Sequence, residues 1–318
     1  MSEDRSRGAF SVNAGGRDQV YLFDPSSHRY AGVSDIPVGR ASLGAFSPDN
    51  RQLAMTLNTA TSPSDIFTLP VSTDGLDHGA MTRWTASEVA GLDASQFVEP
   101  TLIHYPTFDS VQGLPRPIPA WVYKPVSEGP HPVIISIHGG PESQFRPGFS
   151  STFQQWIADL GAAVIAPNVR GSAGYGRDYV QLDNGFKRED SVRDIGALLD
   201  WIETQPDLDK DRIAVFGGSY GGYMVLASMV HYSDRLAAGV DIVGISNFVT
   251  FLENTEDYRR DLRRVEYGDE RDPKMRVHLE SISPSNQPEK ITAPLLVVQG
   301  ENDPVSYTHL RAHETIDD

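Results

Sequence analysis

Residues 217–222 read Gly-Gly-Ser-Tyr-Gly-Gly, and this stretch decides the fold. It follows an apolar run at residues 212–216 and opens a helical run at residues 223–229, so the sequence predicts a strand, a tight turn and a helix. Side chains two positions before and two positions after the serine would clash in such a turn, which explains the glycines there. The turn would hold the hydroxyl of Ser219 out at the carboxyl end of a sheet. The pattern favours a nucleophilic serine over a plain strand–helix turn.

Strand-like and helix-like segments alternate on both sides of this turn. Residues 191–204 have helical spacing, with apolar side chains three and four positions apart. Near-continuous apolar runs, which are typical of strands buried on both faces, occupy residues 133–137, 162–166, 240–243 and 294–298. The alternation predicts an α/β fold of the α/β-hydrolase type, a doubly wound and mostly parallel sheet, over residues 97–304.

Residues 1–96 have a different character, because short apolar runs alternate with polar turns. The runs around Val20 and Ile66 lie 46 residues apart, a spacing typical of the blades of a β-propeller. We therefore expect a partial, all-β, β-propeller-like segment here. A small β-sandwich or an irregular β domain is the alternative that this pattern leaves open.

A second segment completes the chemistry expected at Ser219. A tetrahedral oxyanion needs two backbone N–H donors, one from the residue after the serine and one from a loop after an earlier strand. Tyr220 is the residue after the serine, and residues 138–141, His-Gly-Gly-Pro, follow the strand expected at 133–137. We expect the N–H groups of Tyr220 and Gly140 to form the oxyanion hole, and His138 to shape its loop.

The acid should follow the serine in the chain, and the histidine should follow the acid. Asp303 stands directly after the last expected strand and is the candidate acid, with Glu301 as the fallback. Only His309 and His313 come later, six and ten residues after Asp303. A helix and a strand between acid and base take about 25 residues, so we expect neither histidine to be the native base.

Four segments in this order carry a family resemblance: residues 138–141, 167–176, 217–223 and 300–304. Together they resemble the prolyl oligopeptidase family of serine peptidases, near its dipeptidyl and acylaminoacyl peptidases. The resemblance implies that residues 1–95 are the last blades of an amino-terminal propeller. It also implies peptide substrates, short or N-terminally blocked, that are cleaved through an acyl-enzyme on Ser219.

The resemblance also assigns roles to residues. It gives Ser219 the role of nucleophile and Asp303 that of acid, with the oxyanion held by Tyr220 and the loop of His138 and Gly140. Phe248 and Phe251 fall where relatives build the pocket for the residue before the cleaved bond.

Two departures from the family pattern qualify these expectations. Residues 1–96 hold about two blades, so we expect a chain truncated at its start. Residues 305–318 look like translated sequencing-adapter sequence, and we expect a non-native tail there in place of the last helix and strand. The polypeptide as written is then expected to be inactive for lack of the triad histidine.

Composition excludes several other classes of function. The formal net charge is −16, which disfavours nucleic acids and anionic membranes as partners. There is no cysteine, no phosphate loop appears, and the one metal-ligand spacing, His309 and His313, lies in the suspect tail, so we expect no metal and no cofactor. The start of the chain shows no signal-peptide pattern, which favours the cytoplasm. A carboxylesterase of the same fold and a non-catalytic binding module remain as alternatives.

Overall fold

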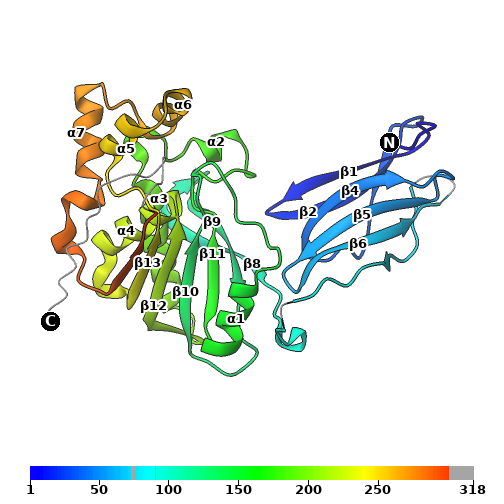
Figure 1. Cartoon of the computed structure of the whole chain (residues 1–318), viewed down its shortest axis with the longest axis horizontal. Helices are drawn as coiled ribbons and strands as arrows, with labels where there is room; N and C mark the ends of the chain where they lie inside the picture. Colours follow the sequence, from blue (N-terminus) through cyan, green and yellow to red (C-terminus); the bar gives the residue numbers. More distant parts are fainter. Residues whose placement is uncertain (73–75, 90, 301–318) are drawn as a thin grey trace. The chain divides into compact units, whose positions relative to one another are not determined.

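The computed structural model of the chain describes residues 1–72, 76–89 and 91–300 (Figure 1). The chain divides into two compact units. The first unit consists of Met1–Thr101, Tyr123–Val126 and Phe145–Gly161, and the second consists of Leu102–Val122, Ser127–Gln144 and the chain from Ala162 onward.

The first unit contains two antiparallel sheets. A three-stranded sheet has the order β1-β2-β3, and a four-stranded sheet has the order β4-β5-β6-β7. Their strands are β1 (Gly8–Ala14), β2 (Arg17–Asp24), β3 (Arg29–Gly32), β4 (Gly39–Phe46), β5 (Gln52–Thr59), β6 (Ser62–Pro70) and β7 (Thr82–Arg83). The unit also includes the 3-10 turn η1 (Ala94–Gln96) and helix α1 (Ser151–Leu160).

In the four-stranded sheet, side chains alternate between the core and the surface along β5. Along β5 every second residue is buried, and Leu53, Met55 and Leu57 all face the core. Val20 and Leu22 of β2 belong to the same apolar cluster. The strands expected around Val20 and Ile66 are thus confirmed, and four antiparallel strands in chain order are the arrangement of a propeller blade.

The second unit is built on a seven-stranded sheet with the order β14-β13-β12-β10-β11-β9-β8. The pairs of strands from β14 to β11 are parallel. The strands are β8 (Thr101–Val111), β9 (Leu114–Tyr123), β10 (His131–Ile137), β11 (Ala163–Pro167), β12 (Leu208–Gly218), β13 (Ala238–Ile242) and β14 (Leu295–Val298). The strands expected from the sequence are all present, and β11 is buried at every position. Burial on both faces was wrong for β14, the end strand of the described sheet, where Leu296 and Val298 are exposed.

Helices connect these strands as crossovers. Helices α3 and α4 contact each other and β12, and α4 also contacts β10 and β13. Helix α4 is apolar all round and buried from Tyr220 to Val230, which explains its place against the middle of the sheet. The helices are α2 (Arg177–Val180), α3 (Asp190–Glu203), α4 (Tyr220–Tyr232), α5 (Phe248–Asn254), α6 (Asp257–Tyr267) and α7 (Pro273–Ser281), and the 3-10 turns are η2 (Gly185–Lys187), η3 (Ser233–Arg235), η4 (Pro284–Asn286) and η5 (Pro288–Lys290).

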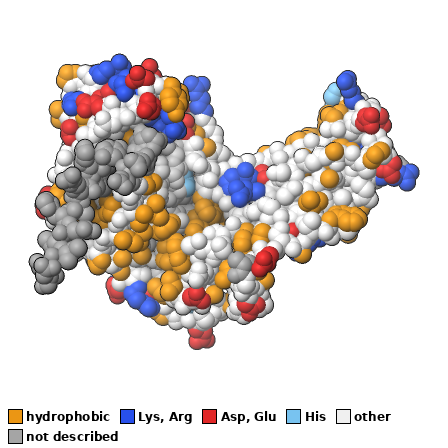
Figure 2. All heavy atoms as spheres, viewed as in Figure 1, with side chains coloured by type: hydrophobic (Ala, Val, Ile, Leu, Met, Phe, Trp, Pro, Cys, Tyr) orange, Lys and Arg blue, Asp and Glu red, His pale blue; other side chains and the backbone are white. Residues whose placement is uncertain are grey.

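In the chain segment that connects β13 to β14, helices α5, α6 and α7 form a group, drawn in yellow and orange in Figure 1. Helix α5 contacts both of the others. Figure 2 shows basic and acidic side chains intermingled over α6 and α7. Some of them pair along or between helices, as Arg264 does with Asp261 and Arg276 with Glu253. Across the described parts of the chain, no helix combines the length and apolar character that a membrane crossing requires.

Candidate active site

Ser219 stands at a corner between β12 and α4. Its backbone angles are φ 56° and ψ −121°, a region that side-chain-bearing residues rarely occupy. The backbone N–H of Ser219 donates to the carbonyl oxygen of Ile242 on β13 at 2.9 Å, and its own carbonyl accepts from the N–H of Tyr223 at 3.1 Å. Ser219 is exposed although its neighbour Tyr220 is buried. The corner therefore presents the hydroxyl to solvent above a packed interior.

The glycines around the serine are there because the backbone approaches itself closely. A Cβ at Gly217 would lie 2.4 Å from the carbonyl oxygen of Gly221, and a Cβ at Gly221 would lie 2.2 Å from that of Ile137. Both contacts are shorter than Cβ atoms tolerate. Gly218 differs, because the nearest atom to a Cβ there is 3.5 Å away. The clash that the sequence predicts within the turn is confirmed at Gly217, whereas the glycine at 221 is required by the neighbouring strand β10.

The loop after β10 lies directly beside Ser219. Strands β10 and β12 are parallel neighbours, with Ile137 opposite Gly217. A Cβ at Gly139 would lie 3.6 Å from the Cβ of Ser219. Gly140 has φ 137°, a conformation that favours glycine. Together these contacts bring the loop of residues 138–141 and the start of α4 to the same side of the serine.

His138 anchors this loop. Its Nδ1 donates to the carbonyl oxygen of Gly139 at 2.8 Å, and its Nε2 lies 2.9 Å from Oγ of Ser172. Burial lowers the pKa of His138 below its ordinary value, although the bond to Gly139 works the other way. Because the ring is neutral near pH 7 and Nδ1 carries its hydrogen, the imidazole holds a carbonyl rather than serving Ser219.

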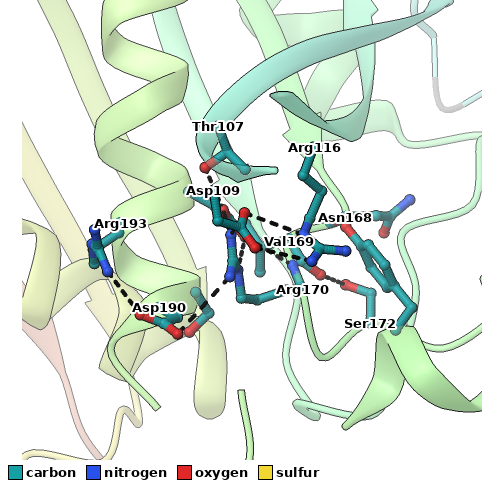
Figure 3. Close-up of polar contacts among 12 residues, drawn as sticks. Thr107, Asp109, Arg116, Asn168, Val169, Arg170, Ser172, Asp190 and Arg193 are labelled. Atoms are coloured by element: carbon teal, nitrogen blue, oxygen red, sulfur yellow. Dashed lines mark hydrogen bonds and ion pairs between the residues drawn. The ribbon is translucent and has the colours of Figure 1, made fainter. Parts of the chain in front are cut away.

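The segment that carries Ser172 is fixed in turn by Arg170 (Figure 3). The guanidinium of Arg170 donates to both oxygens of Asp194, at 2.8 and 2.9 Å, and to Asp109 at 2.9 Å. Asp194 also accepts from the hydroxyl of Thr107 at 2.7 Å. Arg170 and Asp194 are buried, so this is an ion pair without access to water. It holds the loop between β11 and α2, on which Ser172 stands.

The two residues expected to line a substrate pocket lie in an aromatic cluster. Phe248 and Phe251 on α5 are both buried, and their rings lie 5.2 and 5.6 Å from the ring of Tyr267. Both residues are part of an aromatic cluster that also reaches Tyr223 on α4, 4.6 Å from Phe248. The cluster lies against α4, the helix that follows the elbow, which is the sharp turn at residues 217–221. The role of the two phenylalanines as a pocket stays a prediction.

Asp241 was not singled out by the sequence reasoning, yet it lies under the elbow. It belongs to β13, opposite Gly217, and is fully buried. Its Oδ1 lies 2.2 Å from where a Cβ of Gly222 or of Gly244 would be. Neither oxygen meets hydrogen-bond geometry with a partner among the described residues. Burial raises the pKa of Asp241 to about 6, and the nearby backbone N–H of Gly244 lowers it only in part. An acid inside an otherwise apolar strand was the signal that could have found it.

The candidate acid and the late histidines lie beyond the part of the chain that the structure describes, which ends at Gly300. This applies to Asp303, Glu301, His309 and His313. Of the earlier histidines, His231 stands at the far end of α4, about 18 Å along the helix from Ser219 at 1.5 Å per residue. It bonds to Glu189 at 2.7 Å. Within the described ranges, no three His, Cys, Asp or Glu side chains are placed to hold a metal ion.

The model of the prolyl oligopeptidase family matches residues 147–310, just over half of the chain. The chain is 35% identical over 183 residues to dipeptidyl aminopeptidase BIII of Pseudoxanthomonas mexicana, covering 56% of this chain and 26% of that protein. It is 26% identical over 176 residues to the acylamino-acid-releasing enzyme of Sus scrofa, covering 54% and 24%. The chain thus spans about a quarter of the length of these relatives.

The structural comparison concerns the fold. Prolyl oligopeptidase B of Galerina marginata superposes with a TM-score of 0.77 at 19% identity, covering 93% of this chain and 41% of that one. The fold is therefore an α/β-hydrolase preceded by a partial β-propeller-like segment, as the sequence predicted. With the family match, this settles the classification: the chain belongs to the prolyl oligopeptidase family of serine peptidases.

Proposed function

We propose that this chain carries the catalytic centre of a serine peptidase, with Ser219 as the nucleophile. One observation carries the proposal: an exposed serine at φ 56° and ψ −121°, between a buried strand and a buried helix, with Gly139 against it. The strained corner costs on the order of 1–3 kcal/mol, and such strain clusters at active sites. The N–H groups of Tyr220 and Gly140 are proposed as the oxyanion donors, since α4 begins at Tyr220 and its first N–H groups have no partner within the helix.

The proposed reaction has two halves. The Oγ of Ser219 attacks the scissile carbonyl carbon while its proton passes to a base, and the carbonyl oxygen becomes an oxyanion between the two N–H groups. The C–N bond then breaks, the amine leaves with the proton, and an acyl-enzyme remains. Water attacks the ester carbon in the same way, releasing the acid and returning the proton to Ser219. Asp303 is the proposed partner of the base.

For substrates we propose short or N-terminally blocked peptides. The names of the relatives support this class, since one is a dipeptidyl aminopeptidase and another an acylamino-acid-releasing enzyme. The test compares hydrolysis of an acetyl-amino acid anilide with that of a nitrophenyl ester by the purified chain and by Ser219→Ala. Anilide cleavage that disappears in Ser219→Ala supports the peptidase. Ester cleavage alone points to a carboxylesterase. No Ser219-dependent reaction with either substrate, even when imidazole is added as a base, points to a binding module.

We further propose that a polypeptide of this sequence turns over slowly. Six or ten residues after Asp303 are too few for a helix and a strand, so His309 and His313 are poorly placed as base. Loss of a triad member costs on the order of 10⁴ to 10⁶ in kcat. Added imidazole should then accelerate the acylation of Ser219 by supplying a base. A fast reaction that is insensitive to imidazole and lost in His309→Ala or His313→Ala would overturn this.

A further inference from the structure

A buried charged pair lies behind the elbow, and the proposed chemistry does not use it. Arg188, which precedes α3, donates from Nη1 to Oδ2 of Asp183 at 2.6 Å. Both side chains are 0% exposed. Burial opposes the charge on Arg188, but the Asp183 carboxylate outweighs it and keeps the pKa of Arg188 above its ordinary value. The guanidinium is therefore a permanent cation inside the second unit.

This pair holds the side chain of Tyr220. The Tyr220 hydroxyl donates to Oδ2 of Asp183 at 3.2 Å and accepts from Nη1 of Arg188 at 3.3 Å. It also lies 2.9 Å from Oγ of Ser191, which donates to the carbonyl oxygen of Arg188 at 2.7 Å. The phenol thus donates to Asp183 and accepts from Arg188, the hydroxyl of Ser191 lies against it, and Tyr220 is itself only 1% exposed.

The same guanidinium reaches the end of α6. Its Nη2 donates to the carbonyl oxygen of Glu266 at 2.6 Å. Its carbon Cζ lies 4.7 Å from the ring centre of Tyr267 and 5.3 Å from that of Tyr220, within the range of cation–π attraction. Arg188 therefore joins the last turn of α6 to the first residue of α4. Phe248 and Phe251, the expected pocket residues, pack on the same Tyr267 ring.

Such a pair orients the groups around it more than it stabilises the fold. Removing two charges from water offsets most of their attraction, so a buried ion pair is a weak source of stability. A guanidinium, however, presents its N–H groups in a rigid planar fork that a lysine cannot copy. Because Tyr220 is the first residue of α4, fixing its side chain also fixes the orientation of its backbone N–H.

We propose that Arg188, held by Asp183, is a positioning residue that aims the Tyr220 N–H at the oxyanion and links this donor to α6. The inference rests on the proposed function of Ser219 and Tyr220. A misdirected donor binds the transition state less tightly and leaves the binding of the ground state largely unchanged. The expected signature is a lower rate of reaction at Ser219 with little change in affinity.

The experiment uses the full chain and a fluorophosphonate probe, read by intact mass. Arg188→Met should lower the maximal rate of phosphonylation roughly 10- to 100-fold with the half-saturating concentration of probe unchanged, because small misplacements cost this much. Arg188→Lys should not restore the rate. Arg264→Met is the matched control, since Arg264 pairs with the buried Glu270 near the end of the same helix but does not touch Tyr220. It should lose melting temperature without losing rate.

Two further measurements keep the inference testable. Ser191→Ala removes one partner of the phenol without leaving a buried charge, and it should lower the rate several-fold if Arg188→Met fails to fold. Hydrogen exchange over residues 217–224 should be faster in whichever of the two variants folds, and unchanged in Arg264→Met. If the native chain does not react with the probe even when imidazole is added as a base, the proposed function fails, and exchange alone decides the inference. Native-like rate and native-like exchange in the folded variants would overturn it.

Discussion

At the scale of single residues, Ser219 and Asp241 show what local sequence can and cannot reveal. The glycine at 217 avoids a contact inside the turn, and the glycine at 221 avoids the carbonyl oxygen of Ile137 on β10. Because the pattern around Ser219 spans only a few residues, its strained backbone was predictable. The burial of Asp241 was not, because it depends on Gly222 and Gly244, which pack against it only after β13 has joined the sheet. Chemistry encoded within a few residues is readable in advance, whereas burial arises from the assembly.

Replacing Asp241 with asparagine should make stability less dependent on pH. The folded-state pKa of about 6 exceeds the ordinary value of 3.8, so the folded state binds more protons between these values. Stability contributed by this group therefore falls as pH rises from about 4 to about 6, by up to about 3 kcal/mol. The free energy of unfolding of Asp241→Asn relative to the native chain should rise by that amount over the window, as measured by urea titration.

The control for this prediction is Asp159→Asn, which changes an exposed acid on α1. It should follow the native chain at every pH. A difference between Asp241→Asn and the native chain that stays constant from pH 4 to pH 8 would contradict the assignment of a buried, titrating carboxyl group.

His138→Ala should slow the reaction of Ser219 by roughly 100-fold, the size of losing one oxyanion donor. The Gly139 carbonyl and the Gly140 N–H belong to one planar peptide and point in opposite directions, so His138 directs the second by holding the first. The rate of fluorophosphonate labelling measures the effect. His231→Ala, at the far end of α4, should label at the native rate, and equal rates for both variants would count against the anchoring role.

At the scale of elements, the strands and the crossover α3 followed from hydrophobic patterning, whereas the group of α5, α6 and α7 did not. Helix α6 carries charged residues at most positions, and its Tyr258, Leu262 and Val265, which share one helical face, are exposed instead of packed on the core. It is held by contacts from other elements, such as that of Arg188 with Glu266. Such long-range anchors leave no periodic signal in the sequence.

Because the elbow lies against β10, we expect alanine at Gly221 to cost more stability than alanine at Gly218. Gly221→Ala would place a methyl group 2.2 Å from the carbonyl oxygen of Ile137, so the strand or the helix must shift, at a cost of roughly 2–4 kcal/mol. Gly218→Ala meets nothing nearer than 3.5 Å and should cost less than about 1 kcal/mol. Thermal unfolding of the two variants tests this, and equal losses would argue against so close an approach.

At the scale of the whole molecule, the net charge of −16 should make stability depend on salt. Like charges repel one another more in the compact state than in the unfolded chain, and salt screens this repulsion. The melting temperature at pH 8 should therefore rise as sodium chloride increases from 10 to about 150 mM. Near pH 4.9, the isoelectric point of the sequence, the rise should be much smaller. An equal rise at both pH values would rule out net repulsion as the cause.

The central claim concerns the position of one hydroxyl relative to two N–H groups, and a crystal structure of the phosphonylated protein tests it directly. After prolonged exposure to a small fluorophosphonate, the adduct should stand on Ser219. Its phosphonyl oxygen should lie within about 2.7–3.1 Å of the backbone nitrogens of Gly140 and Tyr220. An adduct whose oxygen points to solvent, or folded protein that carries no adduct on Ser219, would contradict the account.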